Sequence, residues 1–337
     1  MTAHTPAAHA SPLAEAPVVA HVVRGELVES VHHGLVVVTS LSGEIELAVG
    51  EVDAPMFPRS SNKPMQAVGM LRAGAELDGP HLALACASHS GEAFHLEAVR
   101  QGLAAVGLDE SYLQNTPSWP IDDEARAAYL AAGGRASSLA QNCSGKHAGM
   151  LAACVAAGWG TQTYRELEHP LQQEIRRAME ELSGDAVEQV AVDGCGAPVM
   201  SLSLAGLARS FGRIASAEDG PEATVARAMR EHPQYVGGTR REVTALMRAL
   251  PGSIAKDGAE AVLALGLPDG RGLAVKITDG QGRACHAVMV EALRALGTTH
   301  ASLDRLAEVP IMGHGRQVGQ VLVTDTVRAG LRAEGGA

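Results

Sequence analysis

The chain has 337 residues, a net charge of −11 and 46% hydrophobic residues, so it is long enough to bury a large core. No run of Lys or Arg stands out, which argues against a nucleic-acid or anionic-membrane partner, and aromatic residues make up only 3%, too few for base-stacking platforms. Five cysteines are too sparse for a disulfide framework, and no apolar run reaches membrane-spanning length. We therefore expect a cytoplasmic protein that binds neither nucleic acid nor membranes.

Residues 1–16 have no basic residue and no apolar segment of the kind that a secretory signal needs, so we expect a disordered tail there. Residues 17–330 are expected to form one domain, whose helical lobe extends over roughly residues 60–250, and residues 331–337 are expected to be a flexible C-terminus.

Short segments rich in β-branched residues predict strands near the N-terminus, at 18–24, 27–33, 35–40 and 44–50. Apolar spacing then predicts helices at 65–73, 93–106, 122–132, 144–157, 169–182, 198–210, 221–231 and 240–249. Strands return at 261–265, 273–278 and 320–325, with a helix at 287–296. One mainly antiparallel sheet built from both chain ends, with helices on its faces and a helical middle lobe, would bury all of them. The predicted fold class is therefore α/β (α+β), in a serine β-lactamase-like arrangement.

The tetrapeptide Ser60-x-x-Lys63 precedes the first predicted helix. Positions i and i+3 share a helix face, so this hydroxyl and this amine can exchange a proton. Serine needs a base to become a nucleophile, and lysine serves as one when burial or a nearby cation lowers its pKa from about 10.4. Taken alone, the spacing is more typical of a helix-capping serine and a solvated lysine.

Two later stretches supply further candidates. Ser88 and Ser90 place two hydroxyls in a turn before a predicted helix, a pattern that an ordinary capped helix start also explains. Lys276 lies in an apolar predicted strand that continues as a Thr-Asp-Gly turn, although a solvated edge-strand lysine is the commoner case. In chain order these motifs approximate the S-x-x-K, S-D-N and K-T-G set of serine β-lactamases and penicillin-binding proteins. The third motif departs from K-T-G and the first two lie close together, so antibiotic hydrolysis is not the expected reaction.

Two glycine-rich stretches indicate a metal site. Cys143 opens a predicted helix, Lys146 and His147 follow it at i+3 and i+4, and Cys195 lies in a tight turn after an apolar run. From spacing alone we expect Cys143, Cys195 and His147 to bind zinc, because thiolate and imidazole are its usual ligands. Ordinary buried cysteines beside a capping loop explain the same pattern equally well.

Together these stretches closely resemble the asparaginase II family, the zinc-containing bacterial L-asparaginases with a serine β-lactamase-like fold. The match is carried by residues 58–66, 85–92, 142–149, 192–198 and 273–280, and it extends from the first strands to beyond residue 320. The resemblance implies that the chain hydrolyses L-asparagine to L-aspartate and ammonia.

The resemblance also implies two Ser-Lys dyads, Ser60 with Lys63 and Ser88 with Lys276. Ser60 would be the nucleophile and Lys63 its base, while Ser88 and Lys276 would relay the proton or act as a second base. Which of the two serines attacks stays open.

The zinc ligands that the resemblance implies are Cys143, Lys146 and Cys195, with water in the fourth position, which leaves His147 outside the ligand set. Lysine binds a metal only as the neutral amine, so the ion has to lower its pKa. Asp193 and Arg59 would bind the amino and carboxylate groups of the substrate, with a purely structural ion pair as the alternative for either. The resemblance further favours a homodimer with one Zn²⁺ per chain.

Two other functions stay open. The chain can be another serine amidohydrolase of the same fold, such as a glutaminase or a weak β-lactamase. It can also be a non-catalytic, zinc-binding regulatory protein whose dyads are vestigial.

Overall fold

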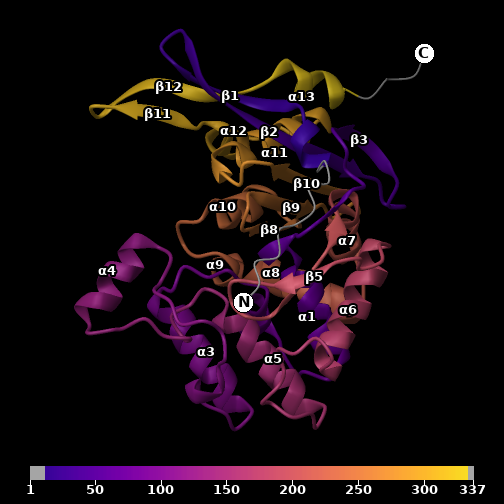
Figure 1. Cartoon of the computed structure of the whole chain (residues 1–337), viewed down its shortest axis with the longest axis vertical. Helices are drawn as coiled ribbons and strands as arrows, with labels where there is room; N and C mark the ends of the chain where they lie inside the picture. The colour runs from indigo at the N-terminus through magenta and orange to yellow at the C-terminus, as the bar shows by residue number, and fades with distance from the viewer. Residues whose placement is uncertain (1–11, 333–337) are drawn as a thin grey trace, which may run out of the picture.

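The computed structural model describes residues 12–332, and Figure 1 shows a sheet above a helical lobe. The strands of the sheet are β1 (Val18–Arg24), β2 (Leu27–Thr39), β3 (Ile45–Val49), β8 (Ile254–Gly258), β9 (Val262–Gly266), β10 (Gly272–Ile277), β11 (Pro310–Gly313) and β12 (Arg316–Val323). They follow the order β11-β12-β1-β2-β10-β9-β8, with β3 also paired to β2 and every pairing antiparallel. Both chain ends therefore build this sheet, which confirms the predicted α+β fold class.

Two small strand pairs lie outside the main sheet. They are β4 (Pro55–Met56) with β7 (Leu202–Ser203), and β5 (Val190–Val192) with β6 (Pro198–Met200). Residues 1–11 and 333–337 of the predicted flexible ends lie outside the described residues, whereas the rest of the predicted N-terminal tail contains the 3-10 helix η1 (Pro12–Glu15).

Helices make up most of the middle of the chain. They are η2 (Arg59–Asn62), α1 (Lys63–Arg72), α2 (Gly79–Ala85), α3 (Ala93–Ala105), η3 (Glu110–Tyr112), α4 (Asp123–Ala131), α5 (Ser144–Ala156), α6 (Pro170–Ser183), α7 (Leu204–Ser216), α8 (Gly220–Glu231), α9 (Pro233–Val236) and α10 (Glu242–Ala249). After the last strands of the sheet core come η4 (Gly282–Ala284), α11 (Cys285–Ala295), α12 (Ala301–Ala307) and α13 (Asp325–Gly330). No helix within residues 12–332 combines the length and apolar character needed to cross a bilayer.

The sheet is covered on both faces. Helices α7 and α11 each pack against the same three strands, β2, β9 and β10, so the sheet lies between them. In the lobe, α1 is central and packs against α5, α6 and α8. The lobe and the sheet meet where η2 packs on β8, the edge strand that lies nearest the lobe in Figure 1.

Two local predictions differ from the structure, and some elements, strand β8 among them, were not predicted. The two strands predicted at 27–33 and 35–40 form the single strand β2, because Gly34 continues the pairing and leaves room for the carbonyl of Lys276, which lies 2.7 Å from where a Cβ would be. The helix predicted at 198–210 begins only at Leu204, after β6 and β7. Strand β8 was not predicted, since its sequence Ile-Ala-Lys-Asp-Gly lacks the apolar alternation that identifies strands.

Candidate active site

Lys63 is the first residue of α1 and is 1% exposed. Its amine donates to the Ser88 hydroxyl at 3.1 Å, to the Cys143 sulfur at 3.2 Å and to the carbonyl of Ala87. Among residues 12–332 no carboxylate pairs with it. Its contacts are therefore a hydroxyl, a thiol and a carbonyl, which place the amine within reach of a serine oxygen.

Ser60 lies in η2, half-buried, and its hydroxyl has no hydrogen-bond partner within the described part of the chain. The amine of Lys63, one turn later, is directed to Ser88 instead. The residue before it, Arg59, has a φ of 51°, a left-handed conformation that costs a non-glycine residue about 1–2 kcal/mol. Ser60 is therefore a free hydroxyl on a strained turn, which is the environment of a residue held for contact with a ligand.

The dyad predicted between Ser88 and Lys276 is not a hydrogen bond in this structure. Lys276 is on the inner strand β10, where its amine donates to the carbonyls of Glu260 at 2.6 Å and Ile277 at 2.7 Å. Burial lowers the pKa of Lys276, although Glu260 opposes that effect. The amine of Lys276 thus holds the turn between β8 and β9 and does not contact the Ser88 hydroxyl.

Lys256, on the edge strand β8, is a residue that sequence reasoning missed. Its side chain is fully buried, and its amine contacts the Asp257 carboxylate at 2.6 Å. Burial lowers the pKa of Lys256 to about 8 against the opposing charge of Asp257, and the positive charge of Lys63 lowers it further. Lys63 and Lys256 therefore lie close enough to influence each other, which makes Lys256 the strand lysine that is electrostatically coupled to the serine-lysine cluster.

A sequence pattern for Lys256 was available. Lys256-Asp257-Gly258 keeps the lysine and the glycine of K-T-G at their proper spacing, which the segment after Lys276 does not. Gly258 also brings β8 against η2, because a Cβ there would lie 2.6 Å from the Pro58 carbonyl and 3.4 Å from the Ser60 nitrogen. This close approach joins the strand lysine to the turn that carries Ser60.

The predicted metal ligands converge. Cys143 immediately precedes α5 and Lys146 lies in its first turn, while Cys195 is held in the tight loop between β5 and β6. The amine of Lys146 contacts the Cys195 sulfur at 3.1 Å, and the thiols of Cys143 and Cys195 are close enough to share a hydrogen bond. All three side chains are buried.

The hydrogen bond between the two thiols shifts their pKa values in opposite directions, down for Cys143 and up for Cys195. A hydrogen bond from Cys195 lowers the pKa of the Cys143 thiol well below its ordinary range, despite burial and with help from Lys63 and Lys146. Burial acts to lower the pKa of Lys146, but the adjacent Cys195 and Cys143 outweigh it and raise that pKa. Within residues 12–332 no three His, Cys, Asp or Glu side chains form a metal-binding group, and the third donor beside the two thiols is the amine of Lys146. Two thiols and one amine fit a zinc site with an open fourth position, once the metal displaces their protons.

His147, a zinc ligand on spacing alone, uses its Nδ1 in a 2.7 Å hydrogen bond with the Tyr164 hydroxyl. Its Nε2 is buried and has no partner among the described residues. Burial lowers the pKa of His147 well below its ordinary value, and the positive charges of Lys146 and Lys63 lower it further, so the ring is neutral. Its partner Tyr164 is buried as well, and no motif in the sequence singled it out.

Arg59 and Asp193, the predicted substrate-binding pair, contact each other. The Arg59 Nε donates to the Asp193 carboxylate at 2.7 Å, and a second guanidinium nitrogen lies 3.7 Å from Glu260. Although burial acts to raise it, the charges of Lys146 and Arg59 lower the pKa of Asp193. This ion pair therefore lies between the turn of Ser60 and the loop of Cys195.

The family model for L-asparaginase II matches residues 20–323 of the chain, which confirms the resemblance drawn from its motifs. No curated protein matches the chain. Among solved structures, Mglu in its native form with 4.3 M NaCl is 13% identical, with a TM-score of 0.44, over 84% of this chain and 66% of its own. A β-lactamase from Mycobacterium bovis is 15% identical, with a TM-score of 0.40, over 74% of this chain and 88% of its own.

The hydrolase EstCE1, which has promiscuous acyltransferase activity, is 12% identical, with a TM-score of 0.40, over 79% of this chain and 91% of its own. The chain covers less than two thirds of the Mglu structures, 58% of the native form. Likenesses this distant carry no functional argument, so the family match and the geometry of the site have to carry it.

Proposed function

The chain belongs to the L-asparaginase II family, and from this premise we propose that it hydrolyses L-asparagine to L-aspartate and ammonia. One observation carries the proposal: the buried amines of Lys63 and Lys256 lie near each other. The hydroxyl of Ser88 contacts Lys63, and the turn with the free hydroxyl of Ser60 packs against the strand of Lys256. Amide hydrolysis through a serine needs this set of groups: a nucleophile, an amine that accepts its proton, and a second group that moves protons.

Ser60 is proposed as the nucleophile and Lys63 as the base that takes its proton, with Ser88 relaying protons at 3.1 Å from that amine. The Ser60 oxygen forms a bond to the side-chain carbonyl carbon of asparagine, and the C–N bond then breaks as the nitrogen receives the proton and leaves as ammonia. Water attacks the resulting ester, and aspartate is released while the proton returns to Ser60. The N–H groups in the first turn of η2 are suited to stabilise the oxyanion.

The second base, which the resemblance assigned to Lys276, is proposed to be Lys256. Its pKa of about 8 keeps a substantial fraction of the amine neutral near physiological pH, which a general base requires. A catalytic role for Lys276 stays a prediction, and its contacts favour support of the β8–β9 turn.

Asp193 and Arg59 are proposed to bind the amino and carboxylate groups of the substrate. Asp193 accepts from the Arg59 Nε and from the Gly194 N–H through Oδ1, and its Oδ2 accepts a longer contact of 4.0 Å from the Cys195 thiol. The pair therefore presents opposite charges side by side, as the α-carbon substituents of an amino acid require.

One Zn²⁺ per chain is proposed at Cys143, Lys146 and Cys195. When bound there, it would supply Lewis acidity and positive charge next to Lys63, which contacts Cys143 at 3.2 Å. The protein's own part is to hold the two thiols and the amine buried at one point. We also propose a cytoplasmic location, since all five cysteines are free and buried, as in a reducing compartment.

A homodimer is proposed through the strands that extend beyond the sheet core, β11, β12, β1 and the first half of β2. Their exposed apolar side chains are Leu27, Val28, Val31, Met312, Val318 and Leu322. Exposed apolar side chains that gather on one region are typical of a protein interface.

The decisive experiment measures ammonia release by the purified, zinc-loaded chain, with asparagine and glutamine as separate substrates. Ser60→Ala should abolish release and leave the fold intact, while acid-quenched wild type should carry an aspartyl ester on the peptide that contains Ser60. An ester on the Ser88 peptide would reverse the two serine roles. Preference for glutamine would favour a glutaminase, and zinc binding with no turnover of either amide would favour the regulatory alternative.

A further inference from the structure

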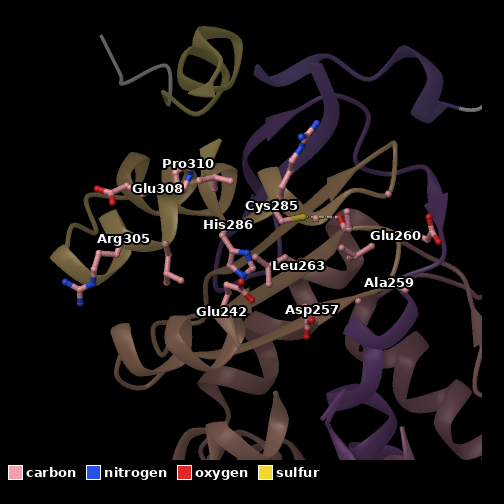
Figure 2. A pocket seen from close by; sticks show the side chains of 18 residues that line it. Glu242, Asp257, Ala259, Glu260, Leu263, Cys285, His286, Arg305, Glu308 and Pro310 are labelled. Carbon is pink, nitrogen blue, oxygen red and sulfur yellow. Dashed lines mark hydrogen bonds between the residues drawn. The ribbon is translucent and has the colours of Figure 1, made fainter. Parts of the chain in front are cut away.

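A cavity of about 660 Å³ lies apart from the serine-lysine cluster, between the β8–β9 turn, the start of α11 and the connection from α12 to β11 (Figure 2). None of Ser60, Lys63, Ser88 or Lys276 lines it. It borders the site through Asp257, which pairs with Lys256, and through Gly258 and Glu260 on the same turn. A cavity of this size accepts a small metabolite.

A histidine in the wall of this cavity has an unused nitrogen. The Nε2 of His286 is buried and has no hydrogen-bond partner among the described residues. Glu242 and Asp257 are close enough to His286 to act on it electrostatically, and Figure 2 shows its ring beside Glu242. Burial lowers the pKa of His286, so the ring is neutral, and in the tautomer protonated on Nδ1 the Nε2 is an acceptor.

Two opposite charges in the same cavity are also unpaired. Neither Glu242 nor Arg305 forms an ion pair with any residue among 12–332, and Arg305 only donates to the Ser302 hydroxyl at 3.0 Å. Both line the cavity without contacting each other, with Arg305 at one end in Figure 2. A neutral acceptor beside a free carboxylate suits an ammonium group, and a free guanidinium suits a carboxylate.

We propose that this cavity binds a small zwitterion of the α-amino-acid class. Its ammonium donates to Glu242 and to Nε2 of His286, its carboxylate lies on Arg305, and an apolar side chain packs on Leu263 and Val309. Glu242 and Arg305 then each gain a partner of opposite charge, Nε2 of His286 gains a donor, and the apolar wall is covered.

Occupancy of this site has a direct route to catalysis. A bound ammonium next to Glu242 adds positive charge near Asp257, whose carboxylate also holds Lys256 at 2.6 Å and pairs with Arg241. The field that Lys256 experiences therefore changes when the cavity fills. This coupling rests on the proposed function, whereas the binding itself does not.

The test uses calorimetry on the full chain without substrate, with L-leucine as probe. L-leucinamide lacks the carboxylate and 4-methylpentanoate lacks the ammonium, so each should bind at least about tenfold more weakly than leucine. Absence of leucine binding at millimolar concentration, or equal binding of either half-ligand, would overturn the proposal.

Variants locate the site. Glu242→Gln and Arg305→Gln should each weaken leucine binding about tenfold. Arg248→Gln is the matched control, because Arg248 lies on the same helix as Glu242 and lines only the neighbouring cavity. An equal loss in Arg248→Gln would place leucine elsewhere and refute the assignment.

Leucine should change asparagine turnover in wild type but not in Arg305→Gln, and binding without this change would refute the coupling alone.

Discussion

The two halves of the site hold their lysines in different ways. In the lobe, Lys63 and Lys146 each contact a cysteine sulfur, at 3.2 and 3.1 Å, and both are in the first turn of a helix. In the sheet, Lys256 pairs with a carboxylate on an edge strand, and Lys276 donates to two carbonyls on an inner strand. In the lobe, both amines therefore lie next to sulfur atoms. In the sheet, Lys256 belongs to the site, whereas Lys276 holds the β8–β9 turn in place.

The difference shows what decides whether a strand lysine reaches a site. Strand β8 is the sheet edge that packs against η2, so Lys256 in the middle of this short strand lies next to the lobe. Strand β10 is enclosed by β2 and β9, and its lysine can reach only the neighbouring backbone. Position in the sheet, and not burial or residue type, separates Lys256 from Lys276.

The largest expected effect comes from replacing these two lysines in parallel. Lys256→Met should lower kcat by about 10²- to 10⁴-fold, because a general base is lost and nothing else on β8 can replace it. Lys276→Met should lower kcat by less than about tenfold, since it removes support for a turn. Steady-state ammonia release measures both, and circular dichroism confirms that each variant is folded.

The reverse order would restore Lys276 to the second-base role that the resemblance implied. Equally large losses of kcat in both variants would mean that Lys256 and the turn held by Lys276 are both required for catalysis. In either case the distinction between edge and inner strand would fail.

The lobe half of the site was predictable from sequence because its information is local. Ser60 and Lys63, and likewise Cys143 and Lys146, are three residues apart, and in a helical segment such a spacing places both side chains in one turn. The sequence pairs Cys195 with Cys143 because both are thiols, and the family resemblance then puts Lys146 in place of His147. Nothing local brings the β5–β6 loop to α5.

The sheet half was less predictable because strand pairing is a long-range property. The sheet from both chain ends was inferred correctly, but β8 was missed, and with it Lys256. A strand with a buried lysine and aspartate breaks the alternation on which strand prediction depends. The sequence also did not predict that the Lys63 amine donates to Ser88 rather than to Ser60. That choice depends on how the end of α2 packs near α1.

The pH dependence sharpens the comparison between the strand lysines. A lysine with its pKa lowered to about 8 is protonated below that pH and neutral above it, so kcat/KM should fall about tenfold per pH unit below 8. Asp257 acts to raise the pKa of Lys256, so Asp257→Asn should move the midpoint to lower pH. Asp279 acts in the same way on Lys276, and Asp279→Asn should leave the midpoint unchanged if Lys256 is the titrating group. A midpoint that moves only in Asp279→Asn would identify Lys276 instead.

Removing the metal tests the lobe half. Chelation, or Cys195→Ser, should raise KM for asparagine about 10- to 100-fold while changing the unfolding temperature little, because Cys143 and Cys195 form a small buried group with Ala197 that is separate from the main hydrophobic core. Zinc content per chain is measured alongside. Cys154→Ala is the control, since that buried cysteine lies on α5 outside the cluster and its loss should leave zinc content and KM unchanged. A normal KM in a zinc-free protein would make the metal structural or absent.

The smallest expected effect separates site from scaffold through two glycines, one on each strand. In Gly258→Ala, a Cβ 2.6 Å from the Pro58 carbonyl pushes η2 away from β8, so kcat should fall while the unfolding free energy changes by about 1–3 kcal/mol. In Gly272→Ala, the new Cβ on β10 meets the carbonyl of Ala208 on α7, far along the strand from the site. That variant should lose stability while each folded molecule keeps its activity. Denaturant unfolding and turnover per folded chain distinguish the two outcomes, and an activity loss confined to Gly272→Ala would show that the inner strand, and not the edge strand, positions the catalytic turn.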